Sequence, residues 1–145
     1  MKRTASGILP IAQSDKTICL AWRSPEVQHG NRWGVIGGML DDPHLDEADN
    51  AVCELVEEVG YVGPISLFPA YVHRLRGFSY HNFIGIVPEP FEFHPHPDHA
   101  WETTRIDWLP YSRIVVLIEA VPEMFHDGLL RLFKASSAQI QGFIR

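Results

Sequence analysis

The sequence has few cysteines, few basic residues and no long apolar run. Its 145 residues include two cysteines, Cys19 and Cys53, and neither lies in a CxxC or Cys/His spacing that could hold zinc. A structural zinc site of that kind is therefore excluded, and we expect reduced thiols in a cytoplasmic protein.

Acidic residues outnumber basic ones, 18 to 12, which gives a formal net charge of -6. A surface that binds duplex DNA needs a basic patch to replace the counterions around the phosphates, so this charge argues against such a partner. Nucleotides remain compatible with it, because a bound metal can carry the positive charge.

The longest apolar stretch, IVVLIEAV, is far too short to span a bilayer and contains Glu119. The N-terminal segment MKRTASGILPIAQSDK is broken by Pro10 and is typical of neither a signal peptide nor an anchor. We therefore expect no membrane partner. A chain of 145 residues, 46% of them hydrophobic, fits one domain that spans residues 1–145.

Several segments rich in β-branched and aromatic residues predict strands. We expect strands at residues 6–11 and 17–23, a short strand within 32–40 that ends in a glycine pair, neighbouring strands at 65–76 and 78–87 around Gly77, and a last strand at 103–110. From about Ser112 onward the chain is predicted to be helical, with interruptions at Pro122 and Gly128.

One helix is predicted with clear ends, over residues 47–59. Asp46 fits the N-cap position, and Gly60 fits the C-terminal position where a positive φ is favoured. Apolar residues at spacings of three and four predict one buried face, formed by Val52, Leu55, Val56 and Val59.

Three glutamates, Glu54, Glu57 and Glu58, fall within an arc of roughly 100° on the opposite face of this helix. A solvated acidic face is the simplest interpretation. However, no lysine or arginine lies three or four positions away to offset the charge, and a glycine-rich strand end precedes the helix. Clustered carboxylates suit a hard cation such as magnesium, so a metal site is the alternative.

The stretch GGMLDDPHLDEADNAVCELVEEVGY resembles the signature box of the Nudix hydrolases, the MutT-like pyrophosphohydrolases. The family pattern runs glycine, five residues, glutamate, seven residues, then Arg-Glu-apolar-any-Glu-Glu-any-Gly-apolar. Gly38 matches the opening glycine, and the closing part is matched by Glu54, Leu55, Glu57, Glu58, Gly60 and Tyr61.

The box is degenerate at several positions. Cys53 stands where the family has an arginine that helps to orient the glutamates, and Ile36 replaces the proline that often precedes the glycine pair. The stretch from Gly38 to Cys53 is one residue longer than the family spacing, so the leading glutamate aligns with His44 or Leu45.

The resemblance implies an α/β/α sandwich around a mixed sheet. It also implies hydrolysis of the diphosphate in a nucleoside diphosphate linked to another group, with magnesium as the cofactor and manganese as an alternative. The implied metal ligands are Glu54, Glu57, Glu58 and the carbonyl of Gly37. The implied general base is one of the helix glutamates, with Glu57 and Glu58 preferred, or Glu102 from another loop.

Other candidates each have a plainer interpretation. Glu102 fits an exposed loop glutamate equally well. Arg23 and Gly38 are candidates for substrate binding, although an ordinary surface arginine is the alternative at Arg23. Aromatic side chains could stack a base or fill the core, and these are Trp33, Phe78, Tyr80 and Trp101.

The loop segment HPHPDH carries His94, His96 and His99. A metal site is one interpretation, but we expect an exposed loop, because the prolines extend it and no second group of ligands accompanies it. Cys53 could be a reactive thiol, and packing beside the core or the site is the preferred alternative.

Two other classes of function stay open at this stage. One is a Nudix-like nucleotide-binding or sensor domain with weak or no turnover, motivated by Cys53 and the longer loop. The other is an acidic domain without metal chemistry. The apolar residues after the segment WLP also make a homodimer an expectation.

Overall fold

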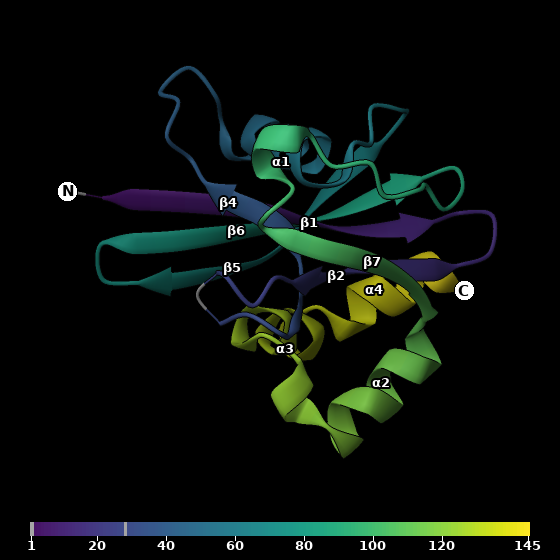
Figure 1. Cartoon of the computed structure of the whole chain (residues 1–145). Coiled ribbons are helices and arrows are strands. Elements are labelled where there is room, and N and C mark those ends of the chain that lie inside the picture. The colour runs from purple at the N-terminus through teal and green to yellow at the C-terminus, as the bar shows by residue number, and fades with distance from the viewer. Residues whose placement is uncertain (1, 28) are drawn as a thin grey trace.

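The computed structural model describes residues 2–27 and 29–145. In this part of the chain, seven strands form one mixed sheet, with α1 (Glu47–Val59) on one face and α2 (Tyr111–Ala120), α3 (Asp127–Ala135) and α4 (Ser137–Ile144) on the other, as Figure 1 shows. The strands are β1 (Arg3–Ala12), β2 (Thr17–Arg23), β3 (Trp33–Gly34), β4 (Ile36–Met39), β5 (Ser66–Leu75), β6 (Phe78–Val87) and β7 (Thr103–Pro110). The expected α/β/α sandwich is confirmed.

Strand β1 is the centre of the sheet. It pairs in parallel with β6 along its whole length, from Arg3 opposite Phe78 to Ala12 opposite Val87. Its other edge is divided, because β4 pairs antiparallel with residues 5–8 while β2 pairs with Ile11. Strand β4 therefore lies beside the first half of β1, and its glycine pair lies under α1.

Alternation along the strands creates two separate cores. Ile8 packs toward α1, and the next residue, Leu9, packs toward the C-terminal helices, since successive side chains of a strand point to opposite faces. The core under α1 includes the fully buried Leu55 and Val59, and the core on the other face includes Phe125.

The predicted helix at residues 47–59 is confirmed, together with its ends. The side chain of Asp46 accepts a hydrogen bond from the amide of Asp49, and Gly60 has a φ of 79°. The predicted faces need correction at two residues. Val56 is 37% exposed, whereas Glu58 is only 6% exposed, because the glutamate faces the loop that enters β7 and the valine faces solvent.

The strand predictions need smaller corrections. Residues 32–40 form two short strands, β3 and β4, which pair with different partners, β2 and β1. The neighbouring strands predicted around Gly77 are confirmed, and β5 and β6 pair antiparallel as a hairpin with Gly77 at a φ of 76°.

In the C-terminal region a short 3-10 turn, Pro122–Met124, interrupts the helices as predicted. Gly128 does not interrupt them, since α3 begins at Asp127 with the ring of His126 as its N-cap. In the described part of the chain, no helix is both long and apolar enough to cross a membrane.

Candidate functional site

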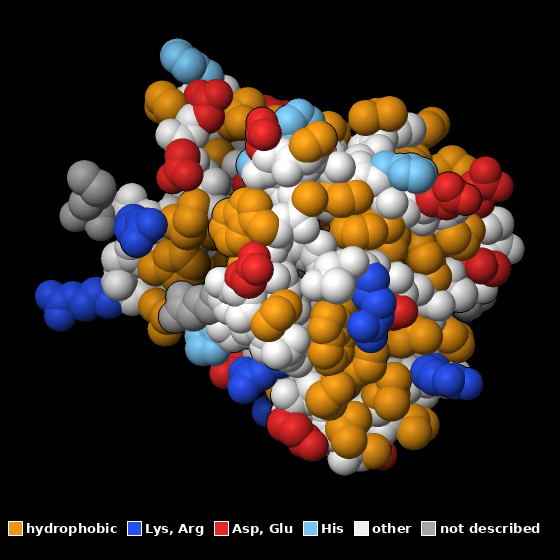
Figure 2. Space-filling view, viewed as in Figure 1, with side chains coloured by type: hydrophobic (Ala, Val, Ile, Leu, Met, Phe, Trp, Pro, Cys, Tyr) orange, Lys and Arg blue, Asp and Glu red, His pale blue; other side chains and the backbone are white. Residues whose placement is uncertain are grey.

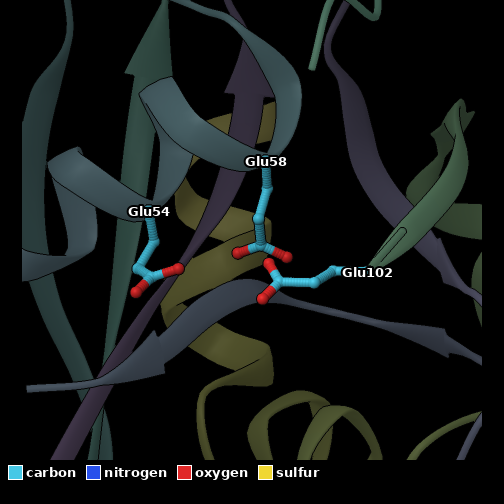
Figure 3. Close-up of side chains that lie close together, drawn as sticks. All are labelled: Glu54, Glu58 and Glu102. Atoms are coloured by element: carbon cyan, nitrogen blue, oxygen red, sulfur yellow. The ribbon is translucent and has the colours of Figure 1, made fainter. Parts of the chain in front are cut away.

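Three carboxylates from two segments meet beside the glycine pair. Glu54 and Glu58 lie one turn apart on α1, and Glu102 comes from the residue before β7. Each offers an oxygen atom within 4.8 Å of the others, and Figure 3 shows the three side chains pointing toward one another. The structure thus brings Glu102, which the sequence placed in an undefined loop, into one cluster with two of the helix glutamates.

Glu58 is the most buried of the three. Its Oε1 atom accepts a hydrogen bond of 3.3 Å from Oγ1 of Thr103, while its Oε2 atom has no hydrogen-bond partner among the described residues. Burial raises the pKa of Glu58 well above its usual range, and the nearby charges of Glu54 and Glu102 raise it further. A buried carboxylate oxygen without a donor is costly unless a proton or a cation is present.

Glu54 is in a similar environment. Burial raises its pKa to about 7, and the charges of Glu57 and Glu102 act in the same direction. Near neutral pH the cluster therefore either holds protons or needs a positive charge. An oxygen-only donor set with an unpartnered buried oxygen fits a hard divalent cation, so the residues present fit the metal that the resemblance implies.

Gly38 leaves room for this cluster, because a Cβ atom there would lie 2.6 Å from Oε1 of Glu54. A Cβ atom on Gly37 would instead meet the neighbouring strand β1, 2.6 Å from the Cα atom of Gly7. Asn50 then fixes α1 to the strands, because its amide donates to the Gly38 carbonyl at 3.1 Å and to Oγ of Ser6 at 2.9 Å.

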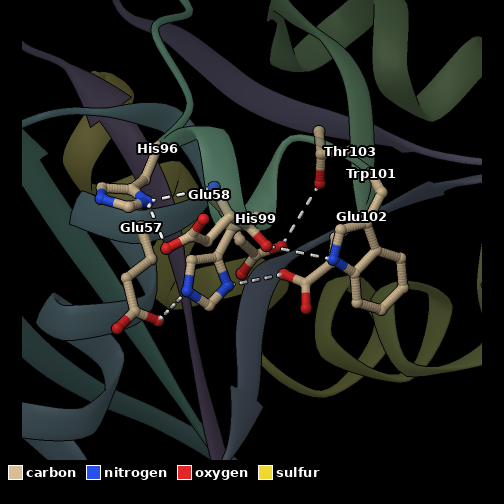
Figure 4. A network of polar contacts seen from close by, with 8 residues as sticks. Glu57, Glu58, His96, His99, Trp101, Glu102 and Thr103 are labelled. Carbon is tan, nitrogen blue, oxygen red and sulfur yellow. Dashed lines mark hydrogen bonds and ion pairs between the residues drawn. The ribbon is translucent and has the colours of Figure 1, made fainter.

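Glu57 lies outside this cluster and beside His99. The two side chains are 3.7 Å apart, from Oε2 to Nε2, and Nδ1 of His99 is 3.8 Å from Oε2 of Glu102 (Figure 4). The prediction of an exposed loop holds for His94 and His96 but is wrong for His99. The physical reason is that main-chain hydrogen bonds hold residues 94–96 against the last turn of α1, and the 3-10 turn Pro97–His99 that follows places the ring of His99 beside Glu57 and Glu102.

Two cavities adjoin the cluster. The acidic one, about 430 Å³, contains the four glutamates and His99, and the second, about 400 Å³, extends toward α3. Arg23, Gly37, Gly38 and Met39 line both. Arg23, whose Nε donates to the carbonyl of His29 at 3.2 Å, thus lies at the junction of the cavities.

The second cavity has basic, imidazole and aromatic walls. It is lined in part by His73, Phe78, Tyr80, His126 and Arg131. Gly128 donates its amide hydrogen to Nδ1 of His126, and burial, Arg23 and His29 lower the pKa of His126 to about 4. His126 is therefore neutral at physiological pH, and Arg131 supplies a positive charge on the same side.

The aromatic candidates lie in three different environments. Phe78 and Tyr80 line the second cavity. Trp33 packs against Phe125, with ring centroids 5.3 Å apart, and Trp101 is 51% exposed.

Cys53 is half-buried beside the acidic face of α1. Burial raises the pKa of its thiol, and the charges of Glu57 and Glu54 raise it further. The thiol is therefore protonated at neutral pH, which argues against a reactive nucleophile.

Comparison with known proteins places this geometry in a family. The sequence model of the NUDIX domain matches residues 1–131. The chain belongs to the NUDIX family. A search of curated proteins found no match.

Solved NUDIX structures share the fold at low sequence identity. A Nudix hydrolase from M. smegmatis, RenU, has a TM-score of 0.69 and 18% identity over 97% of this chain and 84% of its own. The NUDIX domain of NrtR from Shewanella oneidensis, complexed with ADP ribose, has a TM-score of 0.68 and 14% identity, and the match covers 97% of this chain and 89% of that domain. An Ap4A hydrolase from C. elegans has a TM-score of 0.66 and 17% identity, and the match covers 97% of this chain and 98% of the hydrolase. At these identities the likeness shows the fold alone.

Sequence reasoning did not single out two residues that shape the site. Asn50 and Thr103 hold the carboxylate region in place through hydrogen bonds. His99 was named within the segment HPHPDH, but as an exposed loop residue and not as a neighbour of Glu57 and Glu102. The sequence holds one signal for Asn50, because a polar residue four positions before Glu54 lies on the same side of the helix as that glutamate.

Proposed function

We propose that the protein hydrolyses the diphosphate linkage of a nucleoside diphosphate joined to another group, with Mg²⁺ as cofactor and Mn²⁺ as an alternative. The observation that carries this proposal is the unpartnered, buried Oε2 of Glu58 within reach of Glu54 and Glu102. Membership of the NUDIX family, whose members are generally pyrophosphohydrolases, supports the same reaction class.

The residues take the following roles in this proposal. Glu54, Glu57, Glu58 and the carbonyl of Gly37 would hold the cation, which would supply charge neutralisation on the diphosphate oxygens and a lowered pKa for the attacking water. Glu102 accepts the proton from that water. It suits this role because it reaches the cluster from a separate segment and lies within the acidic cavity.

The substrate spans both cavities. Its diphosphate lies in the acidic cavity, and Arg23 and the main chain at Gly38 contact the phosphates at the junction. The group attached to the diphosphate enters the second cavity, where aromatic side chains and Arg131 line the walls. The names of two structural neighbours, which mention ADP ribose and Ap4A, support a nucleotide as the substrate class.

An alternative is a nucleotide-binding or sensor domain with little or no turnover. Cys53 favours it, because this side chain cannot make the charge-assisted hydrogen bonds with which an arginine orients neighbouring carboxylates. The longer loop between Gly38 and α1 points the same way.

A magnesium-supplemented hydrolysis screen tests the two functions. It covers dNTPs, oxidised dNTPs, ADP-ribose, dinucleoside polyphosphates, NADH and capped or triphosphorylated RNA, each with wild type and with Glu58→Gln. We expect metal-dependent product release by the wild type only. Nucleotide binding without turnover would support the alternative, and the absence of both would exclude the two functions together.

We also propose that the protein is cytoplasmic and forms a homodimer through the C-terminal helices. Val116 on α2 is 63% exposed, and Figure 2 shows hydrophobic side chains gathered over this part of the molecule. Light scattering at several protein concentrations tests this, with Val116→Glu as the variant. A mass of one chain at every concentration would exclude the dimer.

A further inference from the structure

Strand β6 presents a buried polar side chain to the second cavity. Phe78, Tyr80 and Asn82 alternate along the strand, so they share the face that packs toward the C-terminal helices, and all three line the cavity. Asn82 is only 4% exposed. A polar side chain buried to this degree usually has a partner for its hydrogen-bonding atoms, so the partners of Asn82 indicate what the cavity lacks.

A bulge in the sheet uses the amide nitrogen of this side chain. Two residues of β5, Ala70 and Tyr71, lie opposite the single residue Asn82 of β6. The carbonyl of Tyr71 accepts a hydrogen bond of 2.9 Å from Nδ2 of Asn82, and the amide of Tyr71 donates one of 3.2 Å to Oγ of Ser136. Because only the nitrogen of a carboxamide can donate to a carbonyl, the first bond fixes the orientation of the Asn82 side chain.

The carbonyl oxygen of the same side chain has no donor. None of the residues that the structure describes donates a hydrogen bond to Oδ1 of Asn82. This oxygen is not enclosed by the core, because the one fully enclosed side-chain polar atom without a partner in the described residues is Oε2 of Glu58. Oδ1 therefore opens into the cavity that Asn82 lines, as an acceptor whose position is fixed.

The surroundings of this acceptor indicate the chemistry of its ligand. A carbonyl oxygen binds N–H and O–H groups and repels the oxygen atoms of a phosphate. The neighbouring side chains of Phe78 and Tyr80 supply aromatic surface, on which a planar ring can stack. A nucleobase with an N–H donor at its edge satisfies both features.

We propose that Oδ1 of Asn82 accepts a hydrogen bond from the exocyclic amino group of a nucleobase bound in the second cavity, which makes Asn82 a specificity-determining residue. The inference rests on the proposed function and deepens it by naming the substrate class, a nucleotide of an amino-bearing base. A base without this group excludes water from Oδ1 and supplies no donor, so the polar atom is left unpaired and affinity falls.

The test measures the binding of matched nucleotides by calorimetric titration with Mg²⁺ present. The ligands are α,β-methylene diphosphates in three pairs that differ by one amino group, namely adenosine and purine riboside, cytidine and 2-pyrimidinone riboside, and guanosine and inosine. We expect the wild type to prefer the amino-bearing member of at least one pair about 10-fold. In Asn82→Ala and Asn82→Thr we expect this ratio to fall to about one.

Ser136→Ala is the matched control. It removes the other side chain that bonds the main chain of Tyr71, and in the described part of the chain Ser136 does not line the cavity. A purely structural role of Asn82 at the bulge predicts the same effect for both positions, with lower melting temperatures and an unchanged ratio. We expect the control to keep the ratio of the wild type.

The outcomes separate this inference from the proposed function. Equal affinities within every pair overturn the inference, and weaker binding of the 2′-deoxy analogue would then assign Oδ1 to the sugar. A preference that persists in a folded Asn82 variant also overturns it. If both Asn82 variants unfold, the wild-type ratio decides alone. Metal-dependent hydrolysis without discrimination leaves the proposed function standing, whereas the absence of both nucleotide binding and hydrolysis removes both.

Discussion

Thr103 donates a hydrogen bond of 3.3 Å to one oxygen of the Glu58 carboxylate and leaves the other oxygen without a partner in the described part of the chain. We predict that Glu58→Gln lowers hydrolysis about 100-fold or more, because it removes a buried charge that acts on the cation. Without metal, the same change should keep or raise the melting temperature, since it removes the like-charge repulsion from Glu54.

Initial rates and melting curves check this, with Glu119→Gln as the control for an exposed carboxylate far from the site. A Glu58→Gln protein with wild-type activity would rule out the assignment of Glu58.

The acidic cluster also predicts how stability without metal changes with pH. The pKa of Glu54 is about 7 in the folded state, above its ordinary value of 4.5, so the folded state binds more protons between these values. Its contribution to stability therefore falls as pH rises through this window, and burial gives Glu58 the same sign. His126 acts oppositely, because its pKa of about 4 lies below its ordinary value of 6.5.

Above pH 6.5, the ordinary pKa of a histidine, the opposing contribution of His126 fades, so the glutamates determine the sign of the slope. We expect the melting temperature of metal-free protein to fall between about pH 6.5 and about pH 8, and a divalent cation to raise it more at the higher pH. Differential scanning calorimetry measures both. Glu54→Gln should flatten the slope, and a slope that is unchanged in this variant would contradict the explanation.

Gly38→Ala should weaken metal binding. The added Cβ would lie 2.6 Å from Oε1 of Glu54, so the carboxylate has to move away from its neighbours. A Cβ on Gly142 would meet nothing within 4 Å, which makes Gly142→Ala a matched control. We expect about a 10-fold loss of affinity for Mg²⁺ in calorimetric titration of the first variant only. Equal affinities would show that the glycine is not needed for the site.

Cys53→Arg restores the family residue. The charges of Glu54, Glu57, Asp49 and Asp42 all act on Cys53, so an arginine at this position has carboxylates to orient. We expect turnover to rise several-fold. A lower rate together with a lower melting temperature would instead show that the longer loop has rebuilt the site around a small side chain.

The two faces of α1 can be separated by a pair of alanine variants. Leu55 is 1% exposed and Val56 is 37% exposed. Leu55→Ala should lower the free energy of unfolding by about 2 to 5 kcal/mol. Val56→Ala should change it by less than about 1 kcal/mol. Urea denaturation of both proteins checks this, and equal losses would mean that the helix faces another way.

Local chemistry explains which parts of the fold could be predicted. The ends of α1 follow from local contacts, because Asp46 accepts a hydrogen bond from the amide of Asp49 and Gly60 donates one to the carbonyl of Val56. The turn between β5 and β6 follows from Gly77, which adopts a positive φ. The exposure of Val56 and the burial of Glu58 could not be predicted. The burial of Glu58 depends on contact with Thr103, which lies 45 positions further along the chain. Periodicity describes one helix and carries no information about what covers it.

The candidate site shows the same division. The spacing of Glu54, Glu57 and Glu58 along the helix could be predicted from the sequence, and so could the glycine pair. The grouping of Glu102 with Glu54 and Glu58, and of His99 with Glu57, depends on a loop whose path is set by main-chain contacts. The ring of His96 caps the 3-10 turn Pro97–His99, but this local contact gives no information about where the loop meets α1.

Amide hydrogens of residues 94 and 96 and carbonyl oxygens of Val59 and Glu57 attach this loop to the end of α1. Because every residue except proline carries these atoms, the side chains at positions 94 and 96 can be replaced without removing the anchor. Proline is the exception at both positions, since it has no amide hydrogen to donate. Substitutions at positions 94 and 96 other than proline therefore leave this main-chain anchor in place, and at position 96 they remove only the ring that caps the 3-10 turn Pro97–His99.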